Sequence, residues 1–284
     1  MNKVSNKAFA KINLTLDVLG TLENGYHEVL MVMQSVSVYD IVTVTKIPQG
    51  IELSVNLPYL PKDSGNIAYK AAEKFFEYTK IKDSGVKIDI SKRIPVGAGL
   101  AGGSSNAAAT LKAMNRLFDA KLSIKELCTI GATLGADVPY CILGGTRLAG
   151  GIGDKLSPLP KMPDCYIVLV KPAFSISTPS VYKKFDLCND FNRPDTDKVI
   201  EGLKKKDLHT IVGGMENVLE AVCLKEHPIL VEAKKELTEL GAIASQMSGS
   251  GPTVFGIFTN YDEACKAKEA LRKKYKTVYI CSPV

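Results

Sequence analysis

The chain has 284 residues, of which 45% are hydrophobic and 23% charged, values that are typical of a globular protein with a full core. The formal net charge of +6 is spread along the sequence and no aromatic residues interleave with a basic stripe, which argues against a nucleic-acid-binding protein. The seven cysteines form no Cys-x-x-Cys pair and the three histidines do not stand at zinc spacing from any cysteine, so no zinc site is expected.

Two further features predict a cytoplasmic protein. The stretch from Met1 to Lys7 lacks the apolar core of a signal peptide. The longest strongly apolar run, residues 165–170, is far too short to span a bilayer. We interpret the cysteines as reduced core thiols, which suits a reducing compartment.

The first third of the chain is predicted to form strands. Residues 8–18 alternate in part between apolar and polar side chains, and residues 29–47 and 51–55 are rich in valine, isoleucine and threonine. Residues 66–79 then change to helical spacing, and residues 86–90 form a short alternating strand. A glycine-rich loop follows that strand directly.

Helices and strands alternate after the loop. Residues 107–118 carry an apolar stripe typical of an amphipathic helix, with Ser104 or Ser105 as its predicted cap, and residues 123–134 indicate another helix. Glycine and proline are frequent over residues 144–163, which we interpret as the boundary between two domains. Beyond it, strands are expected at residues 166–170, 253–258 and 277–280 and helices at 230–240 and 264–271, which favours an α/β sandwich.

The glycine-rich loop, Pro95-Val-Gly-Ala-Gly-Leu-Ala-Gly-Gly-Ser-Ser105, predicts an anion-binding site. Glycine lets backbone amides approach a polyphosphate, and the helix that follows adds partial positive charge at its amino terminus. A dinucleotide-binding unit is disfavoured, because the acidic residue that it needs about 20 positions on would fall near Leu122, between two helices. A Walker loop is excluded because Gly103 stands where its lysine belongs.

Three segments resemble the motifs of the GHMP kinases, the family of galactokinase, homoserine kinase and mevalonate kinase. They are the glycine-rich loop, Ala10-Lys-Ile-Asn-Leu14 and Ser248-Gly-Ser-Gly-Pro-Thr253. Lys11-Ile-Asn13 with Gly25-Tyr26-His27, Gly135-Ala-Asp137-Val-Pro139 and Thr178-Pro179 narrow the resemblance to the 4-diphosphocytidyl-2-C-methyl-D-erythritol kinases. One departure is Leu22-Glu23-Asn24, where those enzymes usually carry Arg-x-Asp; Asn24 before Gly25 still favours a turn.

The resemblance implies an α+β fold of two domains. The first, residues 1–155, would be a ribosomal-protein-S5-like α/β domain that holds the phosphate loop. The second, residues 156–284, would be a ferredoxin-like α/β sandwich. The implied activity is phosphoryl transfer from ATP, with Mg²⁺ bound to it, onto the 2-hydroxyl of the cytidine diphosphate methylerythritol substrate. We expect a monomer or homodimer with no nucleic-acid or membrane partner.

The resemblance also implies the site residues. Asp137 would be the catalytic base and Lys11 its partner. The ATP phosphates would lie on Pro95, Val96, Gly97, Ala98, Gly99, Leu100, Ala101, Gly102, Gly103, Ser104 and Ser105, with Asn66 as a further ATP contact. The substrate would contact Tyr26 and His27 through its cytidine, Tyr182 as a second stacking ring, and Asn13 and Thr178 through the erythritol or diphosphate. No protein metal ligand is assigned beyond Ser104 or Ser105.

From the sequence alone, purely structural roles for these residues stay open. Lys11 could snorkel to the surface, Asp137 could end a turn, and Tyr26 could be a half-buried aromatic residue at a strand end. The rival functions are another small-molecule GHMP kinase of mevalonate or homoserine type, a non-catalytic GHMP-like ligand-binding protein, and an RNA-binding protein. A substrate panel and the salt dependence of RNA affinity would separate them.

Overall fold

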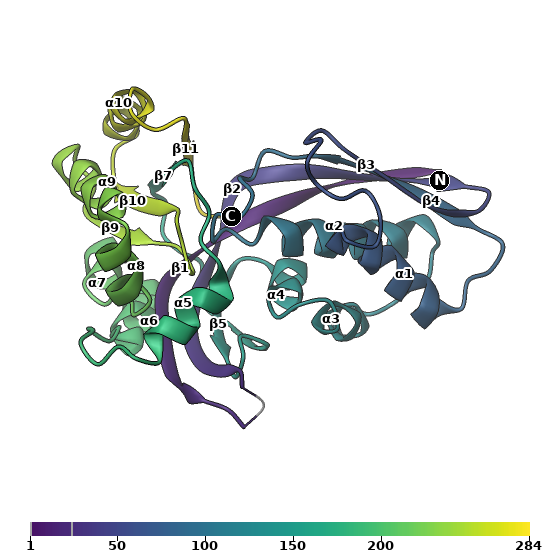
Figure 1. Cartoon of the computed structure of the whole chain (residues 1–284), viewed down its shortest axis with the longest axis horizontal. Coiled ribbons are helices and arrows are strands. Elements are labelled where there is room, and N and C mark those ends of the chain that lie inside the picture. The colour runs from purple at the N-terminus through teal and green to yellow at the C-terminus, as the bar shows by residue number, and fades with distance from the viewer. Residues whose placement is uncertain (1, 24) are drawn as a thin grey trace. The chain divides into compact units, whose positions relative to one another are not determined.

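A computed structural model describes residues 2–23 and 25–284, which group into two compact units (Figure 1). Unit 1 comprises residues 1–10, 38–94 and 101–144, and unit 2 comprises residues 11–37, 95–100 and 145–284. The long strands β1 (Lys3–Thr21) and β2 (His27–Ile47) each contribute residues to both units. The predicted domain boundary after residue 155 stays a prediction, and Asn24 lies outside the described residues.

One sheet has seven strands and contains β1 and β2. Its central order is β3-β4-β2-β1-β8, and β5 pairs with β2 and with β6. The β2–β4, β2–β5 and β5–β6 pairs are antiparallel, whereas β3–β4 and β1–β8 are parallel. The remaining strands of this sheet are β3 (Gly50–Val55), β4 (Gly85–Ser91), β5 (Thr146–Gly150), β6 (Lys155–Pro158) and β8 (Glu216–Asn217).

Four helices of unit 1 cover one face of its strands (Figure 1). They are α1 (Ile67–Thr79), α2 (Gly102–Leu117), α3 (Ile124–Ala132) and α4 (Asp137–Leu143). Apolar residues recur along α1 and α2 at helical spacing, so each helix buries one side, and Phe75 and Met114 are fully buried in the core that results. Ser123 and Glu126 form a capping box that begins α3.

Unit 2 contains a four-stranded sheet with the order β11-β7-β10-β9, antiparallel throughout. The strands are β7 (Tyr166–Lys171), β9 (Ala244–Met247), β10 (Val254–Phe258) and β11 (Thr277–Cys281). In chain order this is fourth, first, third and second, the order of a ferredoxin-like β-α-β-β-α-β unit. The predicted sandwich is therefore confirmed in this unit.

Six helices of unit 2 complete its fold. Two of them, α9 (Pro228–Glu239) and α10 (Tyr261–Arg272), contact the four-stranded sheet. The others are α5 (Thr178–Phe185), α6 (Thr196–Lys205), α7 (Leu208–Val212) and α8 (Glu220–Glu226). No helix in residues 2–23 and 25–284 is long and apolar enough to cross a membrane.

Candidate active site

The first half of the glycine-rich loop, residues 95–100, lies in unit 2 and has the backbone shape that only glycine adopts easily. Gly97 has a φ of 58° and Gly99 a φ of 72°. The Lys11 amide donates to the Leu100 carbonyl at 3.2 Å, and the Ser248 hydroxyl donates to the Gly99 carbonyl at 2.9 Å. The segment 10–14, the first motif, and the segment 248–253, the third motif, thus both hold this part of the loop.

Replacing Gly99 by alanine is expected to lower the free energy of unfolding by about 2 kcal/mol or more. The left-handed backbone alone costs a non-glycine residue about 1–3 kcal/mol, and a Cβ there would lie 2.1 Å from the Ser248 carbonyl oxygen. Urea denaturation measures the loss. Gly103→Ala is the matched control, because a Cβ at Gly103 meets nothing closer than Ile67 at 3.5 Å. Equal stability of the two variants would contradict the close packing of Gly99.

The second half of the loop, residues 101–105, turns into α2 within unit 1. Neither serine caps the helix as predicted: α2 begins at Gly102, so Ser104 and Ser105 lie inside its first turn, and the N-cap residue is Ala101 in a left-handed conformation without a side-chain cap. The Ser105 hydroxyl instead donates to the Phe9 carbonyl at 2.7 Å. No side chain therefore caps the first amides of α2, which suits the binding of an anion.

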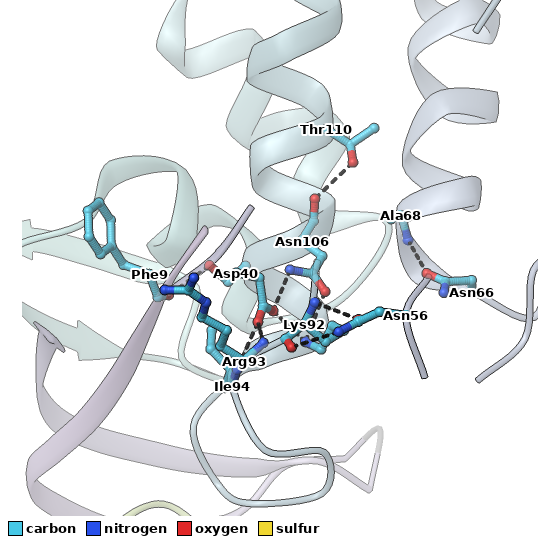
Figure 2. A network of polar contacts seen from close by, with 11 residues as sticks. Phe9, Asp40, Asn56, Asn66, Ala68, Lys92, Arg93, Ile94, Asn106 and Thr110 are labelled. Carbon is cyan, nitrogen blue, oxygen red and sulfur yellow. Dashed lines mark hydrogen bonds and ion pairs between the residues drawn. The ribbon is translucent and has the colours of Figure 1, made fainter. Parts of the chain in front are cut away.

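A buried ionic network holds the segment that leads into the loop (Figure 2). Asp40 on β2 is 0% exposed. One carboxylate oxygen accepts from the backbone amides of Arg93 and Ile94 at 2.6 and 2.8 Å. The other accepts from the Lys92 ammonium at 2.5 Å and the Asn106 amide at 2.7 Å.

The same network reaches α2. Lys92 also donates to Asn106 at 3.0 Å, and a Cβ on Gly102 would lie 3.1 Å from the Lys92 nitrogen. One carboxylate therefore ties the residues before the phosphate loop to the helix after it. No motif marks Asp40, Lys92 or Asn106 in the sequence; the one available signal is a lone aspartate in a strand otherwise rich in valine, isoleucine and threonine.

Lys11 and Asn13 lie side by side in unit 2. Lys11 is 5% exposed and its ammonium donates to the Asn13 side-chain oxygen at 2.7 Å, so Lys11 does not snorkel to the surface. Asn13 is fully buried and its amide contacts the Met31 sulfur at 3.3 Å. A Cβ on Gly249 would lie 3.3 Å from the Lys11 nitrogen, which places the third motif beside this ammonium.

Buried polar side chains hold the third motif, residues 248–253, and the residue before it in place. Asn217 donates to the carbonyls of Met247 and Gly249, both at 2.8 Å. Glu220 accepts from the Met247 amide at 2.5 Å and pairs with Lys234. Burial raises the pKa of the Cys223 thiol to about 12, so the thiol stays protonated and can donate to the Ser250 carbonyl. Asn217, Glu220 and Cys223 could not be predicted from the sequence, because they belong to no motif.

Asp137 is the first residue of α4, in unit 1. The residue is partly exposed and stands in the first turn of the helix. The Gly135 carbonyl accepts from the amide of Val138, so a turn leads directly into the helix. The position leaves the carboxylate available to a ligand, whereas Val138, Pro139 and Tyr140 are buried.

His27 begins β2 in unit 2, and Tyr26 directly precedes it. Tyr26 is 61% exposed as a residue, whereas the side chain of His27 is 12% exposed. Tyr182 on α5 packs against the His27 ring with centroids 4.8 Å apart and an interplanar angle of 36°, and its role as a second stacking ring stays a prediction. The His27 Nε2 lies 2.6 Å from an Asp186 oxygen, a partner that the sequence did not indicate.

Asn66 and Thr178 both occupy helix starts. Asn66 is the N-cap of α1: its side-chain oxygen accepts from the Ala68 amide at 3.0 Å (Figure 2), and its side-chain nitrogen donates to the Pro61 carbonyl. Thr178 begins α5, and its hydroxyl lies 2.7 Å from that of Ser250. The roles of these residues in binding ATP and the substrate stay predictions.

Within residues 2–23 and 25–284, no three histidine, cysteine or acidic side chains gather into a metal-binding group. No cysteine in the described part of the chain forms a disulfide. The two serines of the loop differ in availability: the Ser105 hydroxyl is buried and already donates to Phe9, whereas Ser104 is partly exposed.

Family models match both halves of the chain. The model described as "GHMP kinases N terminal domain" matches residues 66–145, and the model described as "GHMP kinases C terminal" matches residues 199–277. Together with the mixed sheets and helices, they confirm the predicted two-domain GHMP kinase fold.

Curated relatives and a solved structure match nearly the whole chain. The 4-diphosphocytidyl-2-C-methyl-D-erythritol kinase of Clostridium botulinum is 50% identical over 274 residues, covering 96% of this chain and 98% of the relative. The kinase of the same name from Alkaliphilus metalliredigens is 48% identical over 281 residues, covering 99% and 96%. A crystal structure of 4-(cytidine 5'-diphospho)-2C-methyl-D-erythritol kinase aligns with a TM-score of 0.81 at 33% identity, covering 99% of both chains. The chain therefore belongs to the 4-diphosphocytidyl-2-C-methyl-D-erythritol kinases, within the GHMP kinase family.

Proposed function

We propose that this chain is an ATP-dependent kinase that phosphorylates the 2-hydroxyl of 4-diphosphocytidyl-2-C-methyl-D-erythritol, in the non-mevalonate route to isoprenoid precursors. The observation that carries the proposal is the identity of about half the residues over 96% of the chain with curated enzymes of that name. The glycine-rich loop, with its uncapped helix start, supplies the phosphate-binding part.

The chemistry that we propose needs one base and one cation. The 2-hydroxyl oxygen forms a bond to the γ-phosphorus as the bond to the ADP oxygen breaks, and the hydroxyl proton passes to Asp137. The Lys11 ammonium, held by Asn13, supplies positive charge that stabilises the phosphoryl group during transfer. The amides of residues 97–104 bind the remaining phosphate oxygens.

The same proposal assigns the other predicted residues. Tyr26 and His27 bind the cytosine, and Tyr182, which packs against the His27 ring, is the second stacking ring. Asn13 and Thr178 contact the erythritol or diphosphate, and Asn66 contacts ATP. Ser104 would be the residue that holds a Mg²⁺ arriving with ATP, because the Ser105 hydroxyl already donates to Phe9, and the ion would neutralise phosphate charge. We place the enzyme in the cytoplasm, a reducing compartment that suits cysteines outside disulfides.

A substrate panel tests the proposed activity. A coupled assay follows ATP consumption with each substrate. We expect kcat/KM for the cytidine diphosphate methylerythritol to be at least about 10³-fold above that for mevalonate or homoserine, because those two lack the cytosine that Tyr26 and His27 are proposed to bind. Comparable rates with mevalonate or homoserine would sink the assignment of substrate. Absence of ATP turnover with all three would favour a binding protein.

A further inference from the structure

The imidazole of His27 is held on two sides by one helix. Its Nε2 lies 2.6 Å from Oδ1 of Asp186, the C-cap residue directly after α5, and Tyr182 packs against the ring face. Tyr182 and Asp186 are four residues apart and so lie on the same side of the helix. The Asp186 carboxylate is 42% exposed and the His27 side chain 12%, so the pair stands at the surface with the imidazole mostly covered.

The hydrogen bond to Asp186 decides which nitrogen of the ring carries the proton. An ionised carboxylate can only accept hydrogen bonds, so Nε2 must be the donor in this contact. In a neutral imidazole the other nitrogen, Nδ1, then keeps its lone pair and is an acceptor. Among the described residues, Asp186 is the hydrogen-bond partner that the structure gives to this ring.

We propose that Asp186 is a positioning residue that makes this site selective for cytosine over uracil, by fixing His27 Nδ1 as a hydrogen-bond acceptor. The inference rests on the proposed function, in which His27 binds the base of the substrate. Cytosine carries a donor amino group at position 4, which matches an acceptor nitrogen. Uracil carries a carbonyl oxygen there, which places acceptor against acceptor and leaves both unpaired.

Kinetic discrimination between two substrates tests the proposal. The wild-type chain is expected to favour the cytidine over the uridine form of the substrate by about 10²-fold or more in kcat/KM. In Asp186→Ala that ratio is expected to fall about tenfold, mainly through KM, because the imidazole can then present either nitrogen as donor. An unchanged ratio in Asp186→Ala would overturn the proposal.

A matched variant removes a neighbouring ion pair without touching the imidazole. Lys184, two residues before Asp186 on α5, pairs with Glu226 at 2.5 Å, and both side chains are exposed. Lys184→Ala is expected to keep the cytidine-to-uridine ratio of the wild type. An equal fall of the ratio in both variants would show that α5 acts only through its general stability, which contradicts a role for the Asp186–His27 contact.

The tautomer can be read directly by NMR. The chain has three histidines, so a long-range ¹H–¹⁵N spectrum contains three imidazoles, and His209 and His227 serve as internal references. We expect His27 to be protonated at Nε2 in the wild type and to become a tautomer mixture in Asp186→Ala. Protonation at Nδ1 in the folded wild type would overturn the proposal even if the variant does not fold. If the wild-type chain turned over neither the cytidine nor the uridine form of the substrate, the proposed function would be contradicted, while this spectrum would still report the tautomer of His27.

Discussion

Asp137→Asn is expected to lower kcat about 10³-fold while changing the KM for ATP little. An asparagine keeps the size of the side chain at the start of α4 but cannot accept the proton of the attacking hydroxyl, and general-base catalysis contributes about 10²–10⁴-fold. Steady-state kinetics with the coupled assay measure both constants.

The control for Asp137 is a carboxylate in the same unit with no proposed role. Asp119 is exposed and lies 3.8 Å from Lys121 in a surface ion pair, so Asp119→Asn should leave kcat unchanged. Near-normal kcat in Asp137→Asn would remove this residue as the base. A similar fall in both variants would mean that the loss reflects folding rather than proton transfer.

Asp40→Ala is expected to lower the free energy of unfolding by about 3–5 kcal/mol, because it leaves the buried Lys92 ammonium without its counter-charge. It also removes the acceptor for the amides of Arg93 and Ile94. Since these residues lead directly into the phosphate loop, we expect the KM for ATP to rise as well. Urea denaturation and ATP kinetics measure the two effects.

Two further variants sharpen the Asp40 prediction. Asp40→Asn keeps one oxygen for the backbone amides but turns a donor toward Lys92 and Asn106. It should therefore lower the free energy of unfolding by less than Asp40→Ala does, but still by more than about 1 kcal/mol. Glu77→Ala breaks the exposed pair with Lys74 and should cost less than about 0.5 kcal/mol. If Asp40→Ala destabilised the chain no more than Glu77→Ala, the network would not hold the loop.

Regular elements with a strong apolar pattern could be predicted from the sequence. The helix that was expected over residues 66–79 exists as α1, with Asn66 as its cap, and the strand that was expected over 86–90 exists as β4. The hairpin of β5 and β6 was not predicted, because it lies in the glycine-rich and proline-rich stretch that suggested a linker. The short helix α4 was missed because Pro139 and the glycines around it favour a turn.

The candidate site was only partly predictable for a different reason. Motifs identify residues that touch a ligand, such as Gly99, Lys11 and His27, because the ligand demands their chemistry. The residues that hold them, among them Asp40, Asn217 and Asp186, lie far away in sequence and work through contacts that only the folded chain creates. No local pattern marks such residues, apart from a charge placed in an apolar strand.

The most direct test of the central claim is the identity of the phosphorylated product. The purified chain is incubated with ATP, Mg²⁺ and the cytidine diphosphate methylerythritol. We expect ³¹P NMR of the product to show a new monoester phosphate bonded to the oxygen at the 2-position, with the diphosphate intact. The Asp137→Asn variant under the same conditions should form almost none of it. A phosphate at another hydroxyl, or no ATP-dependent product from the wild-type chain, would contradict the account.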